Sequence, residues 1–160
     1  MNTKASFDVI DGAAVLLNGT LTGLLFAFSA AVMPALGQQT AVAGAATMQS
    51  INRMIVNPVF LVVFLGSALC AVAAGVLAMA GSHRSWWIVA GATICFVGTF
   101  VVTVVFNIPL NGRLDMVDVN SVDGQQFWRQ YLSQWTAWNH LRVASGIVGT
   151  ALLVTGLVRR

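Results

Sequence analysis

Four long apolar runs, separated by shorter polar stretches, make up most of the chain. They cover about residues 12–36, 58–80, 86–110 and 139–158. A helix needs about 20 residues to cross a hydrocarbon core of roughly 30 Å. Because lipid leaves no partner for an unpaired backbone polar group, such runs must form helices or closed barrels, and these runs are too long and unalternating for barrel strands. The pattern predicts an all-α integral membrane protein, a four-transmembrane-helix bundle that forms one domain over residues 1–160.

The connections between these runs are unequal in length. Residues 81–85 make a tight turn, whereas residues 37–57 and 111–137 form two long connections that fall on the same side of the membrane. Neither long connection is rich in Pro and Ser or strongly charged. We therefore expect helical connections that cap one end of the bundle.

The fourth run is the least regular. Its uncharged part, residues 143–158, is short for a span, and extending it backwards brings in Asn139, His140 and Arg142. These side chains would then lie at the membrane boundary, where polar groups need protein or water as partners.

Composition supports a lipid environment. Apolar residues make up 58% of the chain and charged residues 8%, and no Glu is present, whereas a soluble domain carries about 25% charged residues. The net charge is only +3 and the basic residues are scattered, so we expect the bilayer and no nucleic acid as partner. The C-terminal arginines favour a multi-pass protein of the cell membrane with both termini in the cytoplasm.

An aromatic stripe precedes the fourth run. Trp128, Tyr131, Trp135, Trp138 and Arg142 are spaced three and four residues apart, so they share one helix face. Aromatic side chains also collect at membrane interfaces as anchors. The adjoining polar residues favour a binding site, and both interpretations stay open.

Two further polar groups lie on the same side of the membrane. Pro109 is expected to kink or end the third helix, and Asn107 and Asn111 flank this break. Met48 and Asn52 lie one turn apart in the first long connection. We expect these groups to meet the residues before the fourth run at one end of the bundle.

Other polar and small residues are read as packing. Asn18 and Thr22 are expected to form interhelical hydrogen bonds. Close helix approach is expected at Gly12, Gly19, Gly23, Gly66 and Gly75.

Metal and transport chemistry find little support. His83 and His140 fall on opposite sides of the membrane, and the chain has no His-x-x-x-His or Cys-x-x-Cys motif. A soft copper site from Met33, Met48, Met54 and His140 is the remaining metal alternative. No acidic residue falls inside the expected spans to couple transport to ions.

In its polar motifs the chain resembles a known family, the anthrone oxygenase-like integral membrane family (the DUF1772 domain). The resemblance extends over nearly the whole chain in order and spacing. It rests on Phe26-Ala27-Phe28-Ser29, Val32-Met33-Pro34, Met48-Gln49-Ser50-Ile51-Asn52, Asn57-Pro58, Asn107-Ile108-Pro109-Leu110-Asn111 and Trp128 to Arg142.

The resemblance implies oxidation of an anthrone-like lipophilic aromatic by O₂, with no metal or other cofactor. Proton abstraction from the ring CH₂ would give an enolate that reacts with O₂. By this hypothesis His140 is the base, because an imidazole exchanges its proton near neutral pH, and Arg142, Asn107 and Asn111 stabilise the oxyanion. The substrate would contact Met48, Asn52, Trp128, Tyr131, Trp135, Trp138 and Asn139.

A second function also fits the sequence. The same pocket would serve a non-catalytic small membrane subunit or a lipophilic-ligand-binding protein. A homo-oligomer and a partner membrane chain are both left open.

Overall fold

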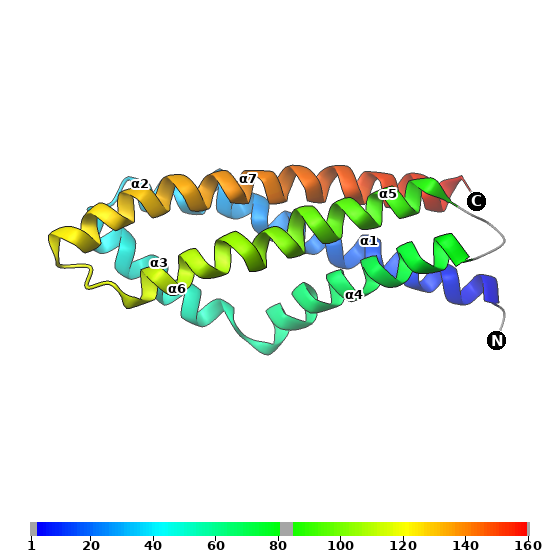
Figure 1. Ribbon diagram of the computed structural model, residues 1–160, viewed down its shortest axis with the longest axis horizontal. Helices are drawn as coiled ribbons and strands as arrows, with labels where there is room; N and C mark the ends of the chain where they lie inside the picture. Colours follow the sequence, from blue (N-terminus) through cyan, green and yellow to red (C-terminus); the bar gives the residue numbers. More distant parts are fainter. Residues whose placement is uncertain (1–2, 81–84, 160) are drawn as a thin grey trace.

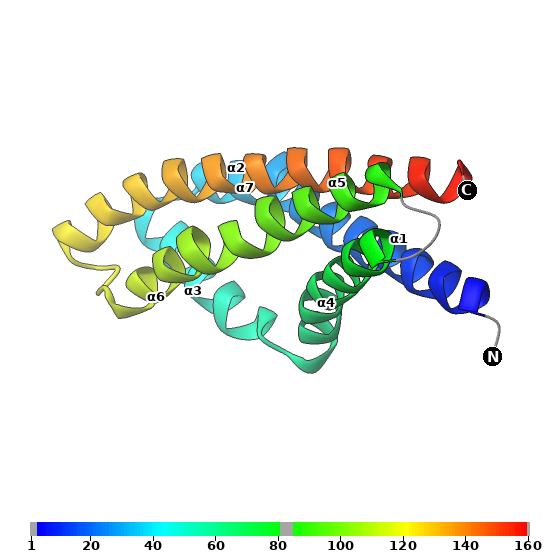
Figure 2. The same ribbon diagram turned by 45° about the vertical axis from the view of Figure 1, so that its right-hand side comes forward.

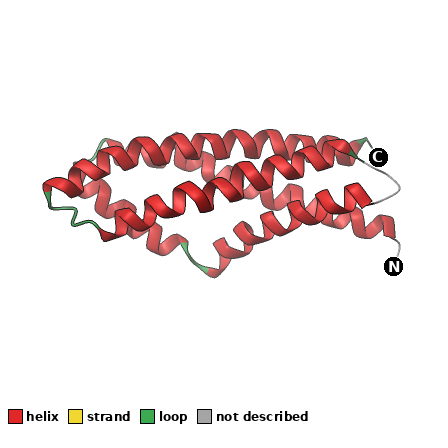
Figure 3. Cartoon of the chain, viewed as in Figure 1, coloured by secondary structure: helices red, strands yellow, loops and turns green. Residues whose placement is uncertain are grey.

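The protein is an elongated bundle of helices that run along one common axis (Figure 1). The computed structural model describes residues 3–80 and 85–159. All regular structure within these residues is helical, as Figure 3 shows, and none is strand. The expected tight turn at residues 81–85 falls, except for Ser85, outside the described residues.

Within residues 3–80 and 85–159, ten helical segments follow one another, and three of them are π-helical. They are α1 (Thr3–Ala27), η1 (Phe28–Val32), α2 (Met33–Gly37), α3 (Ala41–Ile55), α4 (Pro58–Ala80), α5 (Trp86–Cys95), η2 (Phe96–Val101), η3 (Thr103–Asn107), α6 (Ile108–Met116) and α7 (Val122–Val158).

Within the described residues, four continuous helical stretches are long and apolar enough to cross a membrane. They are Asp8–Gly37, Pro58–Ala80, Trp86–Met116 and Val122–Val158. The prediction of an all-α, multi-pass membrane protein is therefore confirmed, and the second span has the predicted limits.

Both long connections lie at the end of the bundle opposite the two chain termini (Figure 1). The first of them forms α3, and the second is taken up by α6, a short loop at residues 117–121 and the start of α7. The chain turns sharply between α3 and α4, and α4 leans away from α6 at this end (Figure 2). The connections are helical, as predicted.

The fourth helix is much longer than the expected span at residues 139–158, and it includes the aromatic stripe. Helix α7 begins at Val122 and runs unbroken for 37 residues, about 55 Å at 1.5 Å per residue. The Ser121 hydroxyl caps it by accepting a hydrogen bond from Gly124 N. A helix can extend beyond its apolar part when neighbouring helices cover the polar part. Asn139 and Arg142 therefore lie in the middle of a helix.

Pro109 does not end the third helix, as the sequence had suggested it could. The Ile108 N–H bonds to the Thr103 carbonyl five residues earlier, so the turn before the proline is π-helical. The Met33 N–H bonds in the same way to Phe28 before Pro34. In a wider π-helical turn, the proline ring no longer clashes with the carbonyl of the preceding turn. The helix can therefore continue beyond the proline.

Helices α5 and α7 approach each other closely because α7 carries glycine at the contact. A Cβ at Gly149 would collide with the Cys95 sulfur and come within 3.0 Å of the Gly91 carbonyl oxygen. The expected close approach at Gly66 and Gly75 is also present, but a Cβ at Gly12, Gly19 or Gly23 would meet nothing within 4 Å. That part of the packing prediction is wrong.

The predicted interhelical bond of Asn18 is present. Its amide donates to the Ser67 carbonyl of α4 at 3.2 Å. Thr22 packs against Gly146 of α7.

Candidate functional site

A cavity of about 400 Å³ lies inside the bundle, toward the end that holds the long connections. Its volume falls in the range of about 300–1,000 Å³ that is typical of small-molecule sites. Helices α1, α3, α4, α6 and α7 all contribute to its wall, which is mostly apolar. The apolar wall residues are Leu24, Leu25, Phe28, Met48, Ile51, Ile55, Val56, Phe60, Leu61, Phe64, Ile108 and Trp135.

One polar stripe crosses this apolar wall. Thr103, Asn107, Asn111 and Asp115 all line the cavity, and they are spaced four residues apart along η3 and α6. Residues four apart share a helix face, so the stripe extends about 18 Å along the helix. It connects the buried interior of the cavity to the exposed Asp115.

Arg142 is the charged group at the buried end of the cavity. Its side chain is only 4% exposed. Nη1 donates to Thr103 Oγ1 at 3.1 Å and Nη2 to Asn139 Oδ1 at 2.6 Å. The guanidinium also lies 5.0 Å from the centre of the Trp135 ring, an arrangement that stabilises a cation.

Arg142 nevertheless has no counter-charge among the described residues. No carboxylate of the described residues lies within ion-pair distance of it, and its buried Nε has no hydrogen-bond partner among them. A buried charge is costly unless it is paired. The site is therefore suited to an anionic oxygen.

Asn107 presents a second unused polar atom. Its Nδ2 donates to the Trp135 carbonyl at 3.4 Å, which fixes the amide orientation because a carbonyl can only accept. Its Oδ1 is buried and accepts no hydrogen bond from any described residue. The cavity thus offers a hydrogen-bond acceptor as well as a cation.

The other end of the stripe is held by a hydrogen-bonded cluster. Tyr131 Oη and Trp135 Nε1 both donate to Asn111 Oδ1, at 2.8 and 2.9 Å. Asn52 Nδ2 reaches the Tyr131 hydroxyl at 3.5 Å. This cluster joins α3, α6 and α7.

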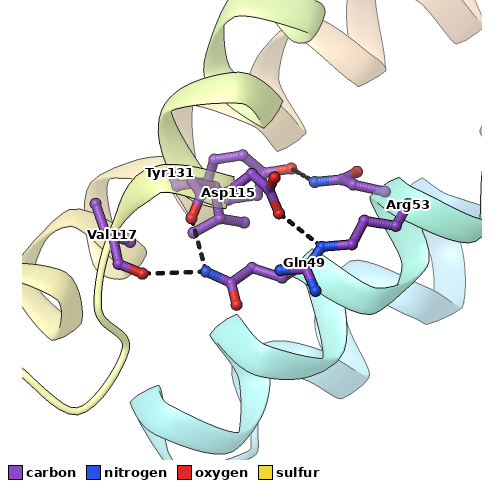
Figure 4. Close-up of polar contacts among 7 residues, drawn as sticks. Gln49, Arg53, Asp115, Val117 and Tyr131 are labelled. Atoms are coloured by element: carbon purple, nitrogen blue, oxygen red, sulfur yellow. Dashed lines mark hydrogen bonds and ion pairs between the residues drawn. The ribbon is translucent and has the colours of Figure 1, made fainter.

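Two contacts tie α3 to the end of α6 at the cavity mouth, as Figure 4 shows. Gln49 Nε2 donates to the carbonyls of Leu114 and Val117 at 2.8 and 3.2 Å. Arg53 forms an ion pair with Asp115, with Nε 2.8 Å from Oδ1. The side chain of Arg53 is 63% exposed and that of Asp115 is 48% exposed. The cavity mouth therefore opens to the outside of the bundle.

His140 lies outside the cavity. It is exposed, it is not among the cavity-lining residues, and its Nδ1 lies 3.0 Å from Ser29 Oγ on η1. Asn139 is fully buried and donates to Leu25 O and Ser29 Oγ, at 2.8 and 2.7 Å. The predicted role of His140 as a base in direct contact with substrate finds no support in this position.

The structure brings together only part of the predicted site. Of the four aromatic side chains of the stripe, Trp135 lines the cavity. Trp128 and Tyr131 pack in the hydrophobic core next to Trp135. Trp138 stacks on Phe106, with ring centroids 3.7 Å apart. The predicted residues that do line it are Met48, Asn52, Asn107, Asn111, Trp135 and Arg142.

Sequence reasoning missed Thr103, Asp115 and the phenylalanines of the wall. Thr103 and Asp115 continue the spacing of Asn107 and Asn111 by one turn in each direction, so helix periodicity could have found them. Phe28, Phe60 and Phe64 resemble ordinary lipid-facing residues in sequence, and only the packing places them at the cavity.

The family model for anthrone oxygenase matches residues 55–152. The chain belongs to the anthrone oxygenase family. The matched segment includes the whole polar stripe and Arg142. Searches of curated proteins and of solved structures found no match.

No three His, Cys, Asp or Glu side chains gather as a metal-binding group in the part of the chain that the structure describes. The expected independence from metal and cofactor stays a prediction.

Proposed function

We propose that this member of the anthrone oxygenase family oxidises a flat, lipophilic, anthrone-like aromatic with O₂ inside the Arg142 cavity. The single observation that carries the proposal is a buried guanidinium, with no counter-ion among the described residues, in an apolar cavity of about 400 Å³. Family membership supports the reaction type. The apolar wall suits a polycyclic ring system that arrives from the bilayer.

The reaction converts a ring CH₂ into a carbonyl. Loss of a proton from the CH₂ gives an enolate, whose negative charge rests mainly on the ring oxygen. The carbon then donates electrons to O₂ and forms a C–O bond, and the resulting peroxide takes up a proton. Loss of water from this hydroperoxide leaves the quinone. One oxygen atom of O₂ enters the product and the other leaves as water.

The protein's contribution is electrostatic. Arg142 Nε would donate to the enolate oxygen, and a fixed cation in an apolar site stabilises such a charge without reorganisation. Thr103 and Asn139 hold the other two guanidinium nitrogens in place. The apolar wall orients the rings.

The test uses purified protein in lipid nanodiscs with anthrone in air-saturated buffer. We expect O₂ uptake and quinone absorbance to rise together, one O₂ per quinone, well above the rate with protein-free nanodiscs. Equal rates in the two samples would contradict the proposal and leave the non-catalytic ligand-binding protein as the function of this cavity.

We also propose that the protein lies in the cell membrane with both termini in the cytoplasm. The terminal Arg159 and Arg160 support this orientation, since basic residues next to spans favour the cytoplasmic side.

A further inference from the structure

We infer that the cavity takes up its ligand as an anion, already ionised before any reaction. The ligand class is an acidic, flat, lipophilic aromatic that carries a phenolate, enolate or carboxylate oxygen, with a hydroxyl group beside it. This inference rests on the proposed site and extends the proposed function to the charge state of the ligand.

The first argument is the charge balance of the cavity. Arg142 is 4% exposed and no described carboxylate pairs with it. Its partners Thr103 and Asn139 are neutral acceptors. Asp115, the one carboxylate that lines the cavity, is already paired with Arg53. An anionic ligand supplies the missing charge and uses the free Nε.

The second argument is the absence of a suitable base near the guanidinium. Among the described residues that line the cavity, none is His and Asp115 is the only acid. Asp115 lies twelve residues from Thr103, about 18 Å along the helix. A ligand oxygen at Arg142 therefore leaves the reacting ring far from Asp115, the only acid among the described lining residues. A ligand that loses its proton to water at the membrane surface before it enters the cavity needs no such group.

The third argument identifies the neighbouring hydroxyl. Asn107 Oδ1 is buried and without a partner, and Asn107 follows Thr103 by one helical turn. A buried acceptor left unpaired costs about 1–3 kcal/mol. A ligand O–H next to the anionic oxygen would satisfy it.

Binding of non-oxidisable probes tests the inference apart from turnover. Anthraquinone-2-carboxylate and its neutral carboxamide are titrated into protein in nanodiscs, and Trp fluorescence is followed. We expect the carboxylate to bind about tenfold more tightly or better, since a hydrogen bond to a charged group contributes about 1.5–3 kcal/mol. If the wild-type protein binds the carboxylate no more tightly than the carboxamide, the inference is overturned, even if the protein oxidises anthrone.

Variants assign the preference to one residue. In Arg142→Gln the ratio of the two affinities should fall to about one, whereas the exposed Arg129→Gln should keep the wild-type ratio. Because both probes see the same lipid in both variants, partitioning cancels from this comparison. An unchanged ratio in Arg142→Gln overturns the inference.

A wild-type measurement covers the case in which Arg142→Gln does not fold. The affinity for 2-hydroxyanthraquinone is measured across pH, and binding should tighten as the phenol of the probe ionises. Weaker binding of the ionised phenol would contradict the inference. Failure of anthrone oxidation together with a clear anion preference would instead reject only the proposed reaction.

Discussion

At the scale of single residues, the structure separates two polar side chains that the sequence places side by side. Arg142 points into the cavity, whereas His140 lies on the exposed side of α7 and contacts Ser29. They are two positions apart on one helix, so their directions differ by about 200°. We therefore propose that chemistry in the cavity depends on Arg142 and not directly on His140.

Replacing His140 tests this separation. We expect His140→Ala to keep anthrone oxidation within a few-fold of wild type, because the imidazole is exposed and does not line the cavity. The measurement is the initial rate of anthrone-dependent O₂ uptake in nanodiscs. A loss of about 100-fold or more, the size expected for a general base, would restore His140 as the base.

At the scale of helices, two features of the sequence set the shape of the site. The π-helical turns before Pro34 and Pro109 widen the helices where Phe28 and Thr103 line the cavity. At the opposite half of the bundle, glycine brings α7 against α5. Close packing at one end thus anchors helices that separate around a cavity at the other.

Replacing Gly149 tests the close packing. Gly149→Val should destabilise the protein by about 1–3 kcal/mol, the usual cost of overpacking a tight contact, because a Cβ there collides with Cys95. The measurement is the thermal unfolding midpoint in detergent. Gly23→Val is the matched control, since a Cβ built at Gly23 meets nothing within 4 Å. Equal midpoints for the two variants would contradict the described contact.

How much the sequence predicts depends on which physical signal carries each feature. Long apolar runs alone predict the four spans, and the second one to the residue, because transfer into lipid depends on local composition. The start of α7 and the path past Pro109 could not be predicted, since both depend on neighbouring helices. Arg142, Asn107 and Asn111 could be predicted as site residues, because strongly polar groups are costly in a membrane. Whether a polar residue lines the cavity depends on the direction of its side chain, which the sequence does not give.

At the scale of the whole molecule, both termini lie at one end, and helices α3 and α6 lie toward the other (Figure 1). Arg53 of α3 and Asp115 of α6 line the cavity mouth there. Single cysteines introduced at Asn120 and Arg159 in a background with Cys70→Ala and Cys95→Ala test this arrangement. In intact cells a membrane-impermeant maleimide should label position 120 and not position 159. Labelling of both positions would contradict the four-span topology, and the reverse pattern would contradict only the proposed orientation.

The central claim is that the Arg142 cavity is the site of the reaction. The most direct measurement compares anthrone-dependent O₂ uptake of the wild type, Arg142→Gln and Arg129→Gln in identical nanodiscs. Loss of a single group that stabilises an oxyanion costs about 10²–10³ in rate, so we predict a fall of that size for Arg142→Gln and wild-type turnover for Arg129→Gln. Wild-type turnover by a folded Arg142→Gln protein would contradict the account.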